Sequence, residues 1–185
     1  MTDTIDCARR RLLRQTTGAA MLAAFAVLGT SARASSSGPR SLALVHTHTG
    51  EQIDVVYALD EGYVPTAMAT LNHFLRDHYS GEVGIIDPPV FDQLHRVQQL
   101  LGSRNAFEVI SGYRCPATNA RLRSTRGGGV ARNSLHLQGR AIDVRLPGLP
   151  LAELHDAALS LQAGGVGFYP REQFVHFDTG RVRSW

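Results

Sequence analysis

Two short segments of the chain carry residue types that could perform chemistry. In residues 134–143, which read SLHLQGRAID, a histidine and an aspartate stand seven positions apart. In residues 174–178, which read FVHFD, His176 and Asp178 alternate with apolar residues. Side chains alternate between the two faces of a strand, so His176 and Asp178 should lie on one face and their apolar neighbours on the other. The two segments therefore predict a group of imidazoles and carboxylates.

Two imidazoles and one carboxylate form a standard ligand set for catalytic zinc, and His136, Asp143 and His176 would supply it. A zinc ion with a fourth position left for water can polarise a carbonyl group and activate the water. The spacing alone is weak evidence, because a histidine and an aspartate seven residues apart are more often surface residues or hydrogen-bonding partners. From these residues alone, both interpretations stay open.

Three motifs resemble one enzyme family. The motifs SGYR at residues 111–114, His136 with GRA and Asp143, and FVHFD at residues 174–178 occur in the order found in the zinc D-Ala-D-Ala peptidases. That family includes dipeptidases, phage endolysins and hedgehog signalling domains. Residues 134–143 and the run GVGFYP at residues 165–170 are similar to its murein endopeptidase branch. The resemblance covers nearly all of the chain from residue 35 onward.

The resemblance implies roles for four residues. His136, Asp143 and His176 are expected to bind Zn²⁺, and Arg114 falls on the family's substrate-binding arginine. A guanidinium group is suited to this role, because it can donate two parallel hydrogen bonds to a carboxylate or one to a peptide carbonyl.

The general base is less well defined by the resemblance. Much of the family has a glutamate three residues before the last metal-binding histidine, whereas this chain has Gln173 there and Glu172 one residue away. We predict that Asp178 contributes to catalysis instead. It would either accept a proton from water or orient a metal ligand, and the sequence leaves both roles open.

The implied function is that of a zinc metallopeptidase. The substrate would be the stem peptides of peptidoglycan, whose cross-links the enzyme would hydrolyse during cell-wall remodelling. One alternative is a D,D- or L,D-carboxypeptidase that trims stem peptides. Another is a non-catalytic zinc-containing module that binds peptidoglycan, since the hedgehog branch has lost peptidase function and Gln173 replaces a catalytic glutamate.

The first 34 residues have the features of an export signal. Arg9 and Arg10 are followed by one further residue and then two leucines, residues 16–28 carry no charge, and ARA at residues 32–34 is a small-x-small cleavage pattern. The arginine pair is typical of a twin-arginine signal, with an ordinary secretory signal as the alternative. We therefore expect a periplasmic protein without a stable membrane span once residues 1–34 are removed.

The net charge of +3 belongs to this leader, because residues 35–185 carry 14 basic and 14 acidic residues. A neutral domain offers no electrostatic argument for binding nucleic acid. Of the two cysteines, only Cys115 lies after the leader, so no disulfide can form within that part. We expect Cys115 to be structural.

The remaining chain predicts a flexible lead-in at 35–40 and one catalytic domain at 41–185. Apolar periodicity predicts a hairpin at 41–57, helices at 65–78, 88–101, 117–123 and 151–161, a loop at 126–129, and strands at 107–110, 140–146, 166–169 and 174–178. This order predicts the α+β class. The resemblance implies a hedgehog/D-Ala-D-Ala-peptidase-type domain, with a small antiparallel sheet that carries the zinc site and helices packed around it.

The other histidines are expected to be structural or exposed. His46 and His48 should share one face of the hairpin. They could bind a metal there, but we expect them simply to be exposed to solvent. The four histidines outside the hairpin and the candidate site should lie on helices as surface or core residues, namely His73, His78, His95 and His155.

Overall fold

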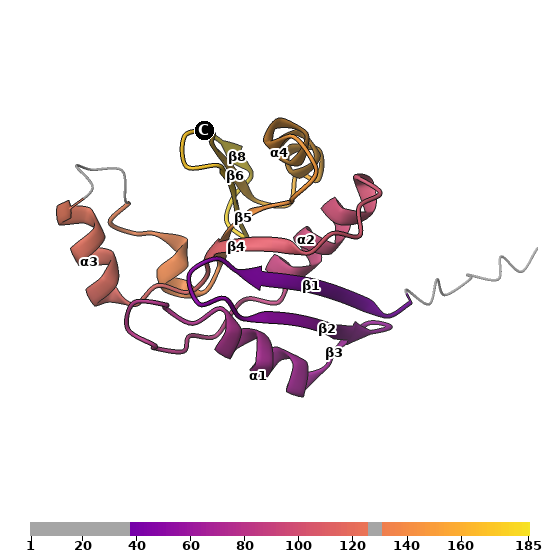
Figure 1. The fold of residues 1–185 in the computed structure, drawn as a ribbon, viewed down its shortest axis with the longest axis horizontal. Coiled ribbons are helices and arrows are strands. Elements are labelled where there is room, and N and C mark those ends of the chain that lie inside the picture. The colour runs from indigo at the N-terminus through magenta and orange to yellow at the C-terminus, as the bar shows by residue number, and fades with distance from the viewer. Residues whose placement is uncertain (1–37, 126–130) are drawn as a thin grey trace, which may run out of the picture. The chain divides into compact units, whose positions relative to one another are not determined.

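The computed structural model describes residues 38–125 and 131–185 (Figure 1). The predicted leader, residues 35–37 of the lead-in and the predicted loop at 126–129 lie outside the described residues. In chain order the elements are β1 (Arg40–His46), β2 (Gln52–Leu59), β3 (Gly62–Tyr63), α1 (Pro65–Phe74), α2 (Pro89–Leu100), β4 (Phe107–Ser111), α3 (Pro116–Thr125), η1 (Leu135–Gln138), β5 (Ala141–Arg145), α4 (Leu151–Ser160), β6 (Gly165–Tyr169), β7 (Phe174–Asp178) and β8 (Arg183–Ser184). None of the helices in this described part is both long and apolar enough to cross a membrane.

The strands form one eight-stranded sheet in the order β3-β2-β1-β4-β5-β7-β6-β8. The α+β class is as predicted, but the sheet is larger than expected and is not wholly antiparallel. β1 pairs with β4 in parallel, because α1 and α2 carry the chain back before β4 begins, and β6 pairs with β8 in parallel. The outermost strands, β3 and β8, are two residues long.

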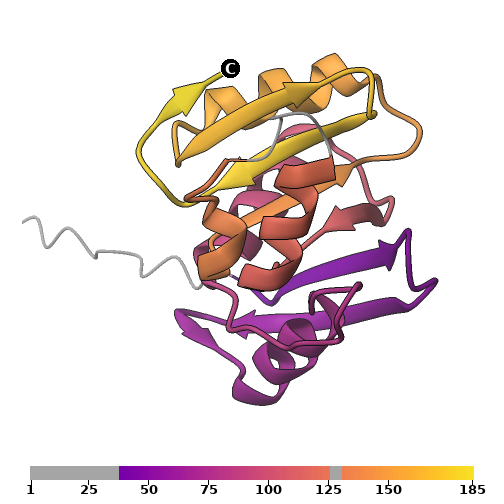
Figure 2. The same ribbon diagram turned by 90° about the vertical axis from the view of Figure 1, so that its left-hand side faces the viewer.

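One face of the sheet is closed by helices α2 and α4, which contact each other and the strands beneath them. Alternate residues of the central strands point into this core, such as Ile142 and Val144 of β5 and Val175 and Phe177 of β7. The residues between them project to the opposite face. Helices α3 and η1 lie on that other side of the strands (Figures 1 and 2). The polar residues of β5 and β7 therefore face α3 and η1.

Helix α1 ends at Phe74, four residues before the predicted end. The carbonyl of Leu75 accepts a hydrogen bond from the backbone of Tyr113 at 2.8 Å, so the chain leaves the helix to pack along the end of β4. Gly112 permits this approach, because a Cβ atom there would lie 2.6 Å from the Leu75 carbonyl oxygen. Helices α2, α3 and α4 match the predicted segments to within two residues.

Two predictions for the histidines are wrong. His46 is fully buried instead of exposed, and its ring packs 5.8 Å from that of Phe74. Because β1 ends at His46, His48 belongs to the turn, where it stacks on His78 at 4.1 Å. His78 lies beyond α1 and not on a helix. The other three histidines that were predicted to lie on helices do so, namely His73, His95 and His155.

Candidate metal centre

His136 is presented by η1, a single turn of 3-10 helix. The Ser134 hydroxyl accepts a hydrogen bond from the backbone of His136 at the start of the turn. Gly139 ends it with φ of 64°, a conformation that favours glycine. A Cβ atom at Gly139 would lie 1.9 Å from the Ile85 carbonyl oxygen. The glycine in the GRA motif is thus required for the position of η1 against residues 85–86.

Asp143 and His176 are placed by the register of the sheet. Asp143 of β5 is the direct cross-strand neighbour of His176 on β7 and of Ser111 on β4. His176 is also the direct neighbour of Gly167 on β6. Cross-strand neighbours share one face of a sheet. Ser111, Asp143, His176 and Gly167 therefore form a row on the face that α3 and η1 cover, and we call it the site row.

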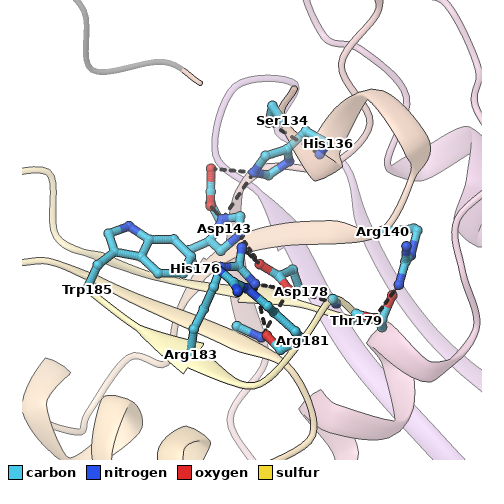
Figure 3. A network of polar contacts seen from close by, with 12 residues as sticks. Ser134, His136, Arg140, Asp143, His176, Asp178, Thr179, Arg181, Arg183 and Trp185 are labelled. Atoms are coloured by element: carbon cyan, nitrogen blue, oxygen red, sulfur yellow. Dashed lines mark hydrogen bonds and ion pairs between the residues drawn. The ribbon is translucent and has the colours of Figure 1, made fainter. Parts of the chain in front are cut away.

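The three predicted ligands meet at the middle of the site row. Candidate ligand atoms of His136, Asp143 and His176 all lie within 4.8 Å of one another, and all three residues are buried. Nε2 of His136 lies 3.3 Å from Nδ1 of His176 and 3.3 Å from a carboxylate oxygen of Asp143. Nδ1 of His176 lies 2.8 Å from the other carboxylate oxygen (Figure 3). Among the residues that the structure describes, His136, Asp143 and His176 are the one such group of three, and we call it the metal group.

The surrounding contacts decide which imidazole nitrogens carry protons. Nδ1 of His136 lies 2.7 Å from the Gly112 carbonyl oxygen, which can only accept, so Nδ1 donates. Nε2 of His176 donates to the carboxylate of Asp178 at 3.2 Å. When His176 is neutral with its proton on Nε2, the remaining lone pair of each imidazole points toward the carboxylate of Asp143. Such a convergence of electron pairs repels itself unless a cation lies between them, so the residues present fit a metal ion.

The ionisation of the group indicates the same demand for positive charge. Burial alone would raise the pKa of Asp143, but the charges and hydrogen bonds of the two histidines hold it well below its usual range. Burial alone would lower the pKa of His176, but hydrogen bonds to Asp143 and Asp178 raise it to about 9. The centre therefore attracts a cation, be it a proton or a metal ion.

Asp178 lies behind His176 and not beside the common centre. Its carboxylate is fully buried and accepts hydrogen bonds from the backbones of Gly165 and Gly180, at 3.0 and 2.8 Å, and from the guanidinium of Arg183. With His176 as the further donor, both oxygens are occupied. These donors outweigh the burial of the carboxyl and keep its pKa well below its usual range. The geometry favours the orienting role over the role of proton acceptor.

Arg114 lies at one end of the site row. Its backbone donates to the His136 carbonyl at 3.1 Å, and its half-buried guanidinium donates to the Ser111 hydroxyl at 3.3 Å. Since Ser111 is the cross-strand neighbour of Asp143, the sheet brings the predicted substrate-binding group to the flank of the metal group. Cys115 is buried next to it, with Sγ 3.4 Å from the Thr118 hydroxyl oxygen, in keeping with a structural role.

Gln173, which stands where much of the family has a glutamate, lies in an exposed turn. Gln173 has φ of 58°, is exposed and bonds through its side chain to the Pro170 carbonyl. Glu172 is exposed in the same turn. Neither side chain has a contact with the three predicted ligands in the described hydrogen-bond network.

Sequence reasoning missed two residues at the other end of the site row. Arg183 bonds to Asp178, and the Trp185 ring centre lies 5.3 Å from that of His176. The residues between Asp178 and Trp185 have no periodic pattern. The one available signal was Gly167 in the middle of a strand, because an interior glycine often marks close approach of another group.

Comparison with known proteins adds sequence relatives. The model of one protein family, described as peptidoglycan L,D-endopeptidase MepK, matches residues 34–185. The peptidoglycan L,D-endopeptidase MepK of Escherichia coli K12 is 45% identical over 183 residues, which cover 99% of this chain and 100% of that protein. The probable peptidoglycan L,D-endopeptidase MepK of Haemophilus influenzae is 42% identical over 155 residues, 83% of either chain. No solved structure matches the chain.

Proposed function

Because the chain belongs to the family of the peptidoglycan L,D-endopeptidases MepK, and is thus a peptidase, we propose that it is a zinc-dependent murein endopeptidase. Its substrate is the peptide cross-link of peptidoglycan, which it hydrolyses during cell-wall remodelling. The names of the relatives support an L,D bond as the one cleaved. The observation that carries the metal assignment is the convergence of His136, Asp143 and His176, with Nε2 of the first imidazole and Nδ1 of the second turned toward the carboxylate.

The fold type proposed for the domain is that of the hedgehog and D-Ala-D-Ala peptidases. The support is the placement of the three motifs in one sheet. SGYR begins at the last residue of β4, Asp143 lies on β5, and FVHFD is β7. These three strands are neighbours in the sheet, so the motifs meet at one face. A zinc site on the sheet face, covered from one side by η1, follows from this order.

Zinc is the metal that this donor set favours, since two imidazoles and a carboxylate with an open position are typical of catalytic zinc sites. When bound, zinc supplies a Lewis acid for the scissile carbonyl and for a water molecule. The chain's own residues hold the centre rigid. Gly112 fixes the ring of His136, and Asp178 fixes that of His176, so neither ring can rotate without losing a hydrogen bond.

Arg114 is proposed to bind the substrate. Its guanidinium can donate hydrogen bonds to a peptide carbonyl or a carboxylate beside the metal group, and its hydrogen bond to Ser111 limits its motion. A substrate carbonyl held from this side is presented to the centre of the site row. This orientation reduces the entropy that must be lost as the reaction begins.

Export to the periplasm is proposed on the sequence of the leader. The paired Arg9 and Arg10, the uncharged stretch and the ARA pattern support a twin-arginine signal with cleavage after residue 34. Peptidoglycan lies outside the cytoplasmic membrane, so the proposed substrate requires such a route.

The test uses the purified full chain and cross-linked sacculi, with and without a chelator, followed by chromatography and mass analysis of the released muropeptides. We expect chelator-sensitive conversion of L,D-cross-linked dimers to monomers, and recovery of activity when zinc is restored. His136→Ala should release no products. Trimming of terminal residues without loss of dimers would indicate the carboxypeptidase alternative. An unchanged profile in spite of bound zinc would indicate a non-catalytic binding module and contradict the proposal.

A further inference from the structure

Trp185 lies beside the metal group, at the end of the site row opposite Arg114. Its backbone bonds to Val166 and Phe168, the residues on either side of Gly167. Gly167 has no side chain, and the indole occupies the space above it. A Cβ atom at Gly167 would lie 2.7 Å from the indole ring. The ring is thereby brought onto the same face as His176, as Figure 3 shows.

The indole is held in one orientation although much of it remains accessible. Its Nε1 donates to the Tyr169 hydroxyl at 2.8 Å, and the guanidinium carbon of Arg183 lies 4.7 Å from the ring centre. The residue is nevertheless 49% exposed. A large apolar group that is fixed by its polar edge and exposed on its surface is typical of a binding anchor, because little entropy is lost when a ligand packs on it.

We propose that the indole of Trp185 is a substrate-contacting wall of the active site, and that it binds the aliphatic part of the diamino acid residue in the peptide cross-link. The inference rests on the proposed function and identifies how its substrate lies. Arg114 at one end of the site row offers a cationic group, and Trp185 at the other offers an apolar surface. A cross-link carries both kinds of chemistry, since its carboxylate and carbonyl groups are separated by methylene chains.

The dimensions of the site row agree with an extended peptide. Ser111, Asp143, His176 and Gly167 lie on four neighbouring strands, and strand spacing of about 4.8 Å makes this roughly 14 Å across. An extended chain rises by about 3.4 Å per residue, so roughly four residues fit across the row. The metal group in the middle then has about two residues on each side.

Steady-state kinetics on soluble L,D-cross-linked muropeptide dimers test the contact. For Trp185→Ala in the full chain, we expect KM to rise about 10-fold, with kcat and zinc content within about twofold of the wild type. Trp185→Phe keeps a flat apolar ring and should show a smaller rise. Leu100→Ala removes another exposed apolar side chain, 60% exposed on α2, and should leave both constants unchanged.

Gly167→Ala provides an independent variant, because the added methyl group displaces the indole and the three atoms nearest to it all belong to Trp185. It should reproduce the rise in KM. The double variant Gly167→Ala/Trp185→Ala should be no worse than Trp185→Ala alone, since the methyl group then has no indole to displace.

Trp185 is the single tryptophan of the chain, so its fluorescence reports on the contact directly. During turnover by the zinc-loaded full chain, the emission should shift for as long as dimer is present. Unchanged emission during turnover, or an unchanged KM in Trp185→Ala with lost zinc and lowered kcat, would overturn the inference and leave the proposed function intact. Absence of cleavage by the wild-type chain would instead mean that the proposed function itself is wrong.

Discussion

Each imidazole of the metal group turns one ring nitrogen toward the centre and is held in place through the other. His136 and His176 are held from behind by Gly112 and Asp178, and these outer contacts determine which nitrogen is free. Asp178 is in turn held by Arg183. The chemistry of the centre therefore extends to residues that would not touch a metal ion.

Asp178→Asn tests this dependence. The amide cannot form the ion pair with Arg183 and can present its NH₂ group to His176, so the imidazole is less well oriented. We expect zinc affinity to fall about 10- to 100-fold, as is usual when such outer partners are lost. Competition with a chromogenic chelator measures this affinity.

Asp156→Asn is the matched control, because Asp156 is an exposed aspartate on α4, and this change should leave zinc affinity as it is. If Asp178→Asn bound zinc as tightly as the wild type and lost only kcat, Asp178 would be a proton acceptor after all.

Arg114→Lys tests the substrate-binding assignment. An ammonium group keeps the charge but cannot donate two parallel hydrogen bonds, so we expect kcat/KM to fall about 10-fold or more with unchanged zinc content. Arg104→Lys, at an exposed position, should have no effect on either quantity. Wild-type kinetics in Arg114→Lys would exclude a role for the guanidinium in binding the substrate.

At the scale of elements, a cluster of three histidines joins the β1–β2 turn to the segment after α1. His46, His48 and His78 have ring centres 4.1 to 6.0 Å apart. Nε2 of His46 and Nε2 of His78 are buried, and neither has a hydrogen-bond partner within the described residues. Burial, with smaller contributions from the neighbouring imidazoles, lowers the pKa of both His46 and His78 to about 4.

Acid should therefore destabilise the folded protein through this histidine cluster. The imidazoles stay neutral in the folded protein but take up protons in the unfolded chain below pH 6.5, so the free energy of unfolding should decrease as pH falls from about 6.5 to about 4. For His46 the loss over the whole of this range is roughly 3 kcal/mol. Urea unfolding at pH 7, 6 and 5 measures it.

His46→Leu should make the pH dependence shallower over this range, even if it changes stability at pH 7. The same change at the exposed His73 on α1 serves as the control and should leave the slope as in the wild type. An equally steep slope in His46→Leu would show that another group causes the acid sensitivity.

Regular elements could be predicted from the sequence because their apolar periodicity is strong. The hairpin, the helix at 88–101 and strand β7 were found within one or two residues. The early end of α1 could not be predicted, because it depends on contact with Gly112, some 40 residues away. Burial of His46 was missed for a related reason, since Phe74 and His78, whose rings pack against it, are about 30 residues away in the chain.

The candidate site was only partly open to prediction. Motif order located His136, Asp143 and His176, and the alternation of β7 placed His176 and Asp178 on one face, where they are hydrogen-bonded. The carboxylate oxygens of Asp178 accept hydrogen bonds from Gly165 and Arg183. The spacing of these residues in the sequence does not predict those contacts. Trp185 reaches the site through a parallel pairing of β6 and β8 that the sequence does not indicate.

At the scale of the whole molecule, a metal ion at this centre joins parts that are far apart along the chain. The ligands come from η1, β5 and β7. An ion that binds the folded state and not the unfolded chain stabilises the fold by about 2.7 kcal/mol when its free concentration is 100 times its Kd.

Removal of the metal should therefore lower the melting temperature by roughly 5 to 10 °C. Thermal unfolding of the full chain with excess zinc and with a chelator measures the difference. His136→Ala should melt at the same temperature in both conditions. A wild-type melting temperature that does not depend on zinc would contradict a metal centre built from these three elements.

The two ends of the sheet bear on how copies of the protein behave toward one another. An outer strand offers unpaired backbone groups that can serve as a template for a neighbouring molecule. Here the outer strands are Gly62–Tyr63 and Arg183–Ser184, only two residues each, and the second carries a charged side chain. β3 pairs with only the last two residues of β2, so residues 52–56 of β2 continue past it without an outer strand. These residues form the part of the sheet edge at which strand-to-strand aggregation of crowded copies would start.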